Sequence, residues 1–242
     1  MPKFFIEAGS LIGTHIEIHG GAAHHIVNVL RHEIGDNIIL CDGNSTDYVT
    51  TLISCEKGSK NALAKFEVLE AKKSITEPPI FIRLYQSVIK WDSFDIAIQK
   101  SVEVGASQIV PIVTERSIYK IIDVRKKTER FGRIAKSAAE QSKRGIVPMV
   151  TEPICIDDAI QNKGKVAFFA CCDEEKTLAN RLDQLKIKKV DLWIGPEGGF
   201  TDSEKKSLLA KGIVPFTLGP RVLRSETASI VSIANLLALY QR

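Results

Sequence analysis

The sequence predicts an α/β protein in which a small N-terminal β-barrel or sandwich precedes a larger domain with a mostly parallel sheet. Two patterns indicate this. Short β-rich runs recur in the first third of the chain, whereas strands and helices alternate in the rest. A third observation is the pair Pro78-Pro79 after a charged, Ser/Thr-containing stretch, which is typical of a linker. The 242 residues suffice for two domains, which we place at residues 1–74 and 75–242.

The N-terminal part contains four expected strands and one expected helix. Turn signals such as Gly35-Asp36 and Asp42-Gly43-Asn44 separate the strands. The expected strands are residues 16–18, 37–41, 48–53 and 64–69, and the expected helix is 24–31.

The C-terminal part reads as a sheet covered by helices on both faces, because strands that alternate with helices normally pair in parallel. Its expected strands are residues 80–88, 108–113, 166–172, 190–194 and 214–218. Its expected helices are residues 92–104, 124–143, 201–211 and 226–240. We expect Asp92 and Ser225 to cap two of these helices, and Thr201 with Glu204 to form a capping box on a third.

Composition excludes several classes of protein. Hydrophobic residues make up 44% of the chain and charged residues 26%, which is typical of globular proteins and not of disordered ones. No apolar run approaches the ~18–20 residues of a membrane span, and the start does not resemble a signal peptide. Five scattered cysteines without a C-x-x-C pair indicate a reducing compartment, so we expect a cytoplasmic protein with cysteines in its core. All five histidines lie within residues 15–32, so no metal site or catalytic triad that needs histidine can form from residues 75–242 alone.

Charge is distributed unevenly along the chain. Residues 116–144 contain 10 basic and 3 acidic side chains, whereas residues 1–74 have a small acidic excess. A local basic excess favours a partner rich in phosphate, although a solvated helix face would have the same composition.

Two glycine-containing loops follow two of the last expected strands. They read Gly195-Pro196-Glu197-Gly198-Gly199 and Gly219-Pro220-Arg221. Open α/β sheets bind ligands beyond the carboxyl ends of their strands, and glycines let the backbone approach a ligand closely. Neither G-x-G-x-x-G nor G-x-x-x-x-G-K-[ST] is present, which weakens any dinucleotide or nucleoside-triphosphate reading. From the residues alone, these loops predict a ligand-binding α/β domain, with a pair of plain turns as the alternative.

The loops and their flanks, residues 194–204 and 218–228, resemble the signature of the RsmE-type RNA methyltransferases of the SPOUT class. The resemblance extends to nearly the whole chain and includes residues 95–117 and 138–142. Residues 24–36 resemble the family's PUA-like β-barrel RNA-binding domain. The chain departs from the family at Ile89-Lys90-Trp91-Asp92, where lysine-glycine-aspartate is usual, and at Lys3, where arginine is commoner. Both departures concern local RNA contacts.

The resemblance implies a fold, a reaction and partners. The fold is a parallel sheet with a trefoil knot, and the reaction is S-adenosylmethionine-dependent methylation of N3 of one uridine in 16S (small-subunit) ribosomal RNA. The implied assembly is a homodimer through the last helix, which is apolar on most sides; a helix fully enclosed in the core is the alternative. No metal and no membrane are implied.

The resemblance also implies a cofactor site. Leu218 and Leu223 would flank the adenine, and Glu197 would bind the ribose hydroxyls or the amino group; a core position for the leucines and a solvent-facing turn for the carboxylate are the alternatives. By similarity the cofactor-binding residues are Ala170, Ile194, Gly195, Pro196, Glu197, Gly199, Leu218, Gly219, Leu223, Thr227 and Ala228.

Arg224 is the candidate catalytic residue. An arginine stays protonated and cannot act as a conventional base, but it can stabilise the developing uracil anion or grip an adjacent phosphate. The alternative is a structural pair with Glu226 or Glu197. No residue is assigned as the acceptor of the N3 proton. The candidate RNA-binding residues are Arg31, Arg116, Lys120, Arg125, Lys126, Lys127, Arg130 and Arg133.

Two other functions fit the same sequence. One keeps the enzyme class and changes the acceptor to another RNA, another position or a 2′-hydroxyl. The other is a non-catalytic RNA-binding or assembly factor with a degenerate cofactor pocket, against which the intact glycine loops argue.

Overall fold

The computed structural model describes all residues except 8, 57–61, 118–122, 183–186 and 241–242. The chain forms two compact units. The first comprises residues 1–77 and 139–147, and the second comprises residues 78–138 and 148–242. The first unit therefore includes a segment from the middle of the chain, which the sequence patterns do not reveal. No helix in the described part of the chain is both long and apolar enough to cross a membrane.

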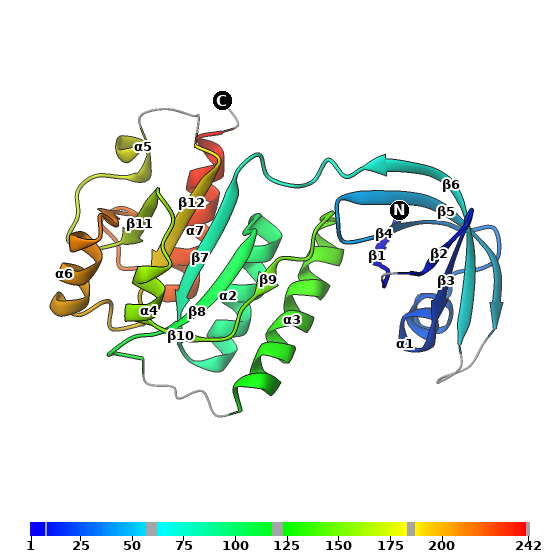
Figure 1. Ribbon diagram of the computed structural model, residues 1–242, viewed down its shortest axis with the longest axis horizontal. Helices are drawn as coiled ribbons and strands as arrows, with labels where there is room; N and C mark the ends of the chain where they lie inside the picture. The colour runs from blue at the N-terminus through cyan, green and yellow to red at the C-terminus, as the bar shows by residue number, and fades with distance from the viewer. Residues whose placement is uncertain (8, 57–61, 118–122, 183–186, 241–242) are drawn as a thin grey trace. The chain divides into compact units, whose positions relative to one another are not determined.

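The first unit is built on a six-stranded sheet in the order β1-β4-β5-β6-β3-β2 (Figure 1). Neighbouring strands are antiparallel, except that β1 and β4 are parallel. The strands are β1 (Lys3–Phe5), β2 (Leu11–Ile12), β3 (His15–His19), β4 (Asn37–Cys41), β5 (Thr46–Glu56) and β6 (Leu63–Lys73). The core contains Ile16, Ile26, Ile38, Leu40, Leu52 and Phe66.

The four expected strands of this unit are present, but its helix differs from the expected one. It starts earlier, as α1 (Gly20–His24), and continues through the π-helical turn η1 (His25–Val29). The helical run ends before Arg31, whose φ of 58° lies in the left-handed region and cannot continue a right-handed helix. Strands β1 and β2 were not expected, because two or three residues carry too little periodicity to be recognised.

Lys3 is a buried structural residue of the first unit. Its ammonium group lies 2.6 Å from Asp47 Oδ1, and it donates hydrogen bonds to Ser74 Oγ and to Lys143 O, each at 3.2 Å. The ion pair and the two hydrogen bonds fix residues 139–147 to the β-sheet. The side chain is only 1% exposed, so the departure from the family at this position affects packing and not an RNA contact.

The second unit contains a sheet whose strands all pair in parallel, which confirms the predicted sheet. Its order is β10-β8-β7-β12-β11-β13, with β9 also paired to β8. The strands are β7 (Phe81–Ser87), β8 (Gln108–Val113), β9 (Met149–Val150), β10 (Ile154–Cys155), β11 (Ala167–Ala170), β12 (Lys189–Ile194) and β13 (Val214–Phe216).

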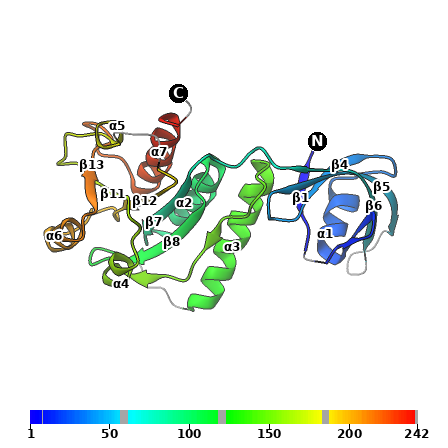
Figure 2. The ribbon, with the colours of Figure 1, turned by 45° about the horizontal axis from the view of Figure 1, so that its top comes forward.

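Helices cover both faces of this sheet, as predicted. On one face α2 (Trp91–Val104) and α7 (Ser225–Ala238) pack against each other, as Figure 2 shows. On the other face, α4 (Ile156–Gln161) and α6 (Asp202–Ala210) cover a core that includes Tyr85, Phe169, Trp193 and Leu208. The remaining helices are α3 (Val124–Gln141) and α5 (Leu178–Arg181).

The predicted helix caps are right in one case and wrong in two. Thr201 and Glu204 form the capping box of α6. The N-cap of α2 is Lys90, and Asp92 lies in its first turn, where a carboxylate still favours the helix dipole. The N-cap of α7 is Arg224, and Ser225 is its first residue. The hydroxyl of Ser225 donates a hydrogen bond to Gly195 O instead of capping the helix.

Candidate ligand-binding site

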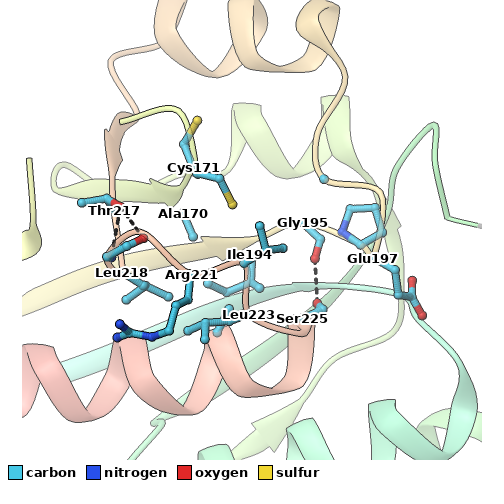
Figure 3. Close-up of a pocket in the computed structure, with 16 residues that line it drawn as sticks. Ala170, Cys171, Ile194, Gly195, Glu197, Thr217, Leu218, Arg221, Leu223 and Ser225 are labelled. Atoms are coloured by element: carbon cyan, nitrogen blue, oxygen red, sulfur yellow. Dashed lines mark hydrogen bonds between the residues drawn. The ribbon is translucent and has the colours of Figure 1, made fainter. Parts of the chain in front are cut away.

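A pocket lies beyond the carboxyl ends of β11, β12 and β13, at the first turn of α7 (Figure 3). The space between its walls, including the part that is open to solvent, is about 600 Å³. The structure brings together the predicted cofactor residues Ala170, Ile194, Gly195, Pro196, Glu197, Gly199, Leu218, Gly219, Leu223 and Ala228. Thr227 is the exception: it lies in α7, half-buried, and does not line the pocket.

Six further residues, which the sequence did not single out one by one, also line this pocket. They are Cys171, Cys172, Thr217, Arg221, Val222 and Ser225. Cys171 and Cys172 directly follow β11, and their place at a strand end was the available signal. The expectation of core cysteines is right for Cys41, which is buried, and wrong for Cys155 and Cys172, which are exposed.

A buried hydrogen-bond network fixes the start of the first glycine loop. Ser225 Oγ donates to Gly195 O at 2.6 Å and accepts from Gln86 Nε2 at 2.9 Å. Gln86 Oε1 in turn accepts a hydrogen bond from Ser229 Oγ. A Cβ at Gly195 would lie 3.2 Å from Phe200 N, so the tight turn leaves little space for a side chain there. The network joins the end of β7, the loop after β12 and the first turn of α7.

The second loop presents Arg221 and Val222 at the edge of the pocket. Thr217 N donates to Lys176 O at 2.9 Å, and Gly219 N donates to Thr217 Oγ1 at 3.1 Å. Gly219 has a φ of 101°, a conformation that favours glycine. Val222 is 83% exposed, which is unusual for a valine and makes the edge of the pocket apolar as well as cationic.

Glu197 does not point into the pocket. Its Oε1 accepts a hydrogen bond from Lys90 N at 3.2 Å, and Figure 3 shows its carboxylate directed away from Ile194, Leu218 and Leu223. A contact with a ribose would therefore require this side chain to rotate. Arg221 is the only cationic side chain among the residues that line the described pocket.

Lys205 on α6 lies near the pocket wall. The hydrogen bond from its Nζ to Asp173 Oδ2, at 3.0 Å, raises the pKa of the ammonium group. The electrostatic interaction with Cys171, which lines the pocket, also raises this pKa.

Arg224 lies next to the pocket without lining it. Its neighbours Leu223 and Ser225 both line the pocket, while its own side chain is exposed. In the part of the chain that the structure describes, neither Glu226 nor Glu197 forms an ion pair with it, so the structural pairing considered as the alternative does not occur there.

The candidate RNA-binding residues fall into three groups. Arg125, Lys126, Lys127, Arg130 and Arg133 lie on α3, Arg31 is exposed in the first unit, and Arg116 contacts the first glycine loop. Lys120 lies outside the described residues. On α3, Arg125 pairs with Glu129, Lys126 with Asp123 and Arg130 with Asp95, while Lys127 lies 4.0 Å from the centre of the Trp91 ring. Exposed pairs of this kind are weak, so they leave the cations available to phosphate.

The described residues contain no group of three or more histidine, cysteine, aspartate or glutamate side chains that could hold a metal ion.

Two family models and several curated proteins match this chain. A family described as an RNA methyltransferase PUA domain matches residues 18–73, and one described as an RNA methyltransferase domain matches residues 76–237. A curated relative in Bacillus subtilis, "Ribosomal RNA small subunit methyltransferase E", is 32% identical over 97% of this chain and 95% of its own length. A relative of the same name in Buchnera aphidicola is 30% identical, with 99% and 94% covered.

Solved structures extend the similarity to the fold. A Neisseria gonorrhoeae ribosomal RNA small subunit methyltransferase E bound to S-adenosylmethionine has a TM-score of 0.86 and 29% identity, with 99% of this chain and 98% of that chain covered. A putative Legionella pneumophila methyltransferase in complex with the same cofactor has a TM-score of 0.87 and 29% identity, with 98% and 97% covered.

Proposed function

The chain belongs to the family of RNA methyltransferases that carry a PUA domain, and on this basis we propose that it methylates N3 of one uridine in 16S ribosomal RNA with S-adenosylmethionine as the methyl donor. The observation that carries the proposal is the pocket at the strand ends, which gathers both glycine loops around one space. Relatives named for small-subunit ribosomal RNA and related structures bound to this cofactor support the choice of substrate and donor.

The lining residues fit the cofactor chemically. Ile194, Leu218 and Leu223 offer apolar surfaces to the faces of adenine, and the backbone of the glycine loops offers hydrogen-bonding groups to its edge. Arg221 supplies a positive charge for the carboxylate of the methionine part. The bound cofactor supplies a methyl group already activated on a sulfonium. This chain's residues therefore have to position the uracil, exclude water and stabilise charge on the base.

Arg224 fits the last of these tasks. It lies at the N-cap of α7, between two residues that line the pocket, and its exposed guanidinium can reach a substrate that enters from solvent. In our proposal it stabilises the negative charge that develops on the uracil as N3 loses its proton, or it holds the adjacent phosphate.

Residues 1–74 act as the RNA-binding domain in this proposal, and residues 75–242 carry out the transfer. Arg31 and the cations of α3 bind phosphate, and the target uridine leaves its stack so that N3 can reach the donor. The RNA substrate and the five free cysteines support a cytoplasmic location.

Two features of α7 support the proposed knot and homodimer. The helix follows β13 at the edge of the sheet, yet it packs on α2, β7 and β12 in the middle, so the chain has to return across the sheet. On its outer side, Ala234 and Ala238 are exposed and Val231 is partly exposed, which leaves an apolar surface for a second copy.

The substrate is tested by mapping modified RNA. In a strain that lacks this protein, we expect mass spectrometry of the ribosomal RNA to find one 3-methyluridine missing from the small-subunit RNA, and the wild-type gene to restore it. If the missing methyl group belongs to transfer RNA, or to a ribose, the enzyme acts on another acceptor than N3 of a ribosomal uridine. Unchanged RNA together with no binding of S-adenosylhomocysteine in calorimetry would favour the non-catalytic reading.

The cofactor's location gives a second prediction. Cys171 and Cys172 line the pocket, whereas Cys155 is exposed outside it. We expect bound S-adenosylhomocysteine to slow alkylation of Cys171 and Cys172 at least several-fold and to leave Cys155 unaffected, because a ligand in the pocket blocks access to its walls. Peptide mass spectrometry after iodoacetamide treatment measures the three rates. The assigned pocket would be contradicted if alkylation of Cys155 slowed equally, or if alkylation of Cys171 and Cys172 did not slow at all.

A further inference from the structure

Arg116 lies against the first glycine loop of the pocket. Its Nη1 donates a hydrogen bond to Gly198 O at 2.6 Å. The aliphatic part of its side chain also covers this glycine, because a Cβ built on Gly198 would lie 3.2 Å from Arg116 Cδ. The loop therefore contacts both the guanidinium group and the aliphatic part of the Arg116 side chain. This close approach is possible because Gly198 has no side chain.

The turn that carries Arg116 is itself held firmly. Thr114 and Ser117 close it through their hydroxyl groups at 2.8 Å and through a hydrogen bond from Ser117 N to Thr114 O at 3.0 Å. Within this turn, Glu115 accepts a hydrogen bond from Thr201 Oγ1 at 3.1 Å and donates its N–H to Glu204 Oε1 at 2.8 Å. Arg116 thus projects from a turn that is tied to the first residues of α6.

Arg116 contacts the middle of the first glycine loop, and other residues hold the two ends of this loop. Ser225 holds its start at Gly195 O, and Glu115 holds the residues just beyond its end at Thr201. Between them, Gly198 O is bound by Arg116. Pro196, Glu197 and Gly199, which surround this contact in the chain, all line the pocket. A change at Arg116 is therefore transmitted to the wall of the cofactor site.

We infer that Arg116 is a positioning residue that holds the first glycine loop in its cofactor-binding shape, rather than one of the phosphate contacts to RNA. The inference rests on the proposed function in one respect, namely that this pocket binds S-adenosylmethionine. It gives Arg116 a role different from the one expected from charge, which placed Arg116 with the cations of α3.

The two roles predict opposite results for Arg116→Ala. A positioning role lowers affinity for S-adenosylhomocysteine by about ten-fold, the usual effect of losing one hydrogen bond from a charged group. Affinity for RNA and its salt dependence then stay unchanged. A phosphate contact would lower RNA affinity and reduce the slope of log K against log salt by about one, with cofactor affinity intact. Calorimetry and RNA-binding titrations at several salt concentrations separate the two.

Three matched variants sharpen the comparison. Arg125→Ala, on α3, is expected to show the RNA-contact pattern. Lys206→Ala removes an exposed charge from α6 and is expected to change neither affinity. Arg116→Lys is expected to bind the cofactor better than Arg116→Ala and less well than the wild type, because one ammonium group replaces a planar fork of donors.

A double-mutant cycle tests the contact itself. Gly198→Ala forces the new methyl group against Arg116 and is expected to weaken cofactor binding, whereas the same change in an Arg116→Ala background is expected to cost much less. Additive effects, or a cofactor affinity that Arg116→Ala leaves unaltered, overturn the inference. Failure of the wild-type protein to bind the cofactor at all would instead refute the proposed function.

Discussion

Replacing Arg224 by alanine is expected to lower the rate of methyl transfer by about 10²–10³ while affinity for S-adenosylhomocysteine stays within a few-fold of wild type. The reason is the position of the side chain. Arg224 stands between two residues that line the pocket but does not line it, so the bound cofactor loses little when the side chain is removed. The charge on the uracil, which develops only during transfer, loses its stabilising partner.

The rate is best measured in single turnovers with enzyme and cofactor saturating, so that binding does not contribute. Arg224→Lys is the matched variant. It keeps the positive charge but replaces the planar guanidinium group by an ammonium group, and an intermediate rate is expected. A fall in cofactor affinity as large as the fall in rate would contradict the assignment. A fall confined to RNA affinity would show that Arg224 grips a phosphate instead of the reacting base.

The parts of the fold that could be predicted are those with a strong local pattern. Residues 37–41 and 108–113 form strands at the expected positions, and the capping box at Thr201 forms as its spacing predicts. The helix caps at Asp92 and Ser225 could not be predicted in the same way. Both residues are good caps in isolation, but Ser225 uses its hydroxyl for Gly195, a residue distant in the sequence, and such a tertiary partner has no local signal.

In the candidate site, too, local motifs could be predicted from the sequence and tertiary contacts could not. The glycine loops identify most of the pocket because each loop is a continuous motif. Arg116 belongs to a different strand end, and only the parallel sheet brings its turn to Gly198. Charge counting therefore grouped it with the basic helix that follows it in sequence. Lys3 was assigned to a local RNA contact for a similar reason, since its partner at Lys143 O lies far along the chain.

A buried ion pair joins the central strands at the end of the sheet away from the pocket. Arg83 on β7 lies beside Asp191 on β12 in the parallel register, whereas Gln86 and Ile194 are the paired residues next to the pocket. Arg83 donates to both carboxylate oxygens, from Nε at 3.0 Å and from Nη2 at 2.5 Å. The carboxylate of Asp191 is fully buried, and the Arg83 side chain is 14% exposed.

The surroundings of this pair are tightly packed. Tyr85 stacks on Trp193 with ring centres 3.9 Å apart, and its hydroxyl donates to Asn162 O, which also accepts from Arg83 Nη2. Burial raises the pKa of Tyr85 to about 12, so this hydroxyl stays protonated and neutral. Gly164 N, which donates to Asp191 Oδ2 at 2.6 Å, is the remaining described hydrogen-bond donor to the carboxylate.

Arg83→Met is therefore expected to destabilise the protein by about 3–5 kcal/mol, because it leaves a buried carboxylate without its counter-charge. Urea unfolding measures this. The double variant Arg83→Met with Asp191→Asn removes the unpaired charge and retains an acceptor for Gly164, so we expect it to recover a large part of the loss. At temperatures where Arg83→Met remains folded, affinity for S-adenosylhomocysteine should be close to that of the wild type, since the pair lies at the opposite strand ends. A single variant that loses less than about 1 kcal/mol, or a double variant no more stable than the single one, would show that the pair contributes little beyond packing.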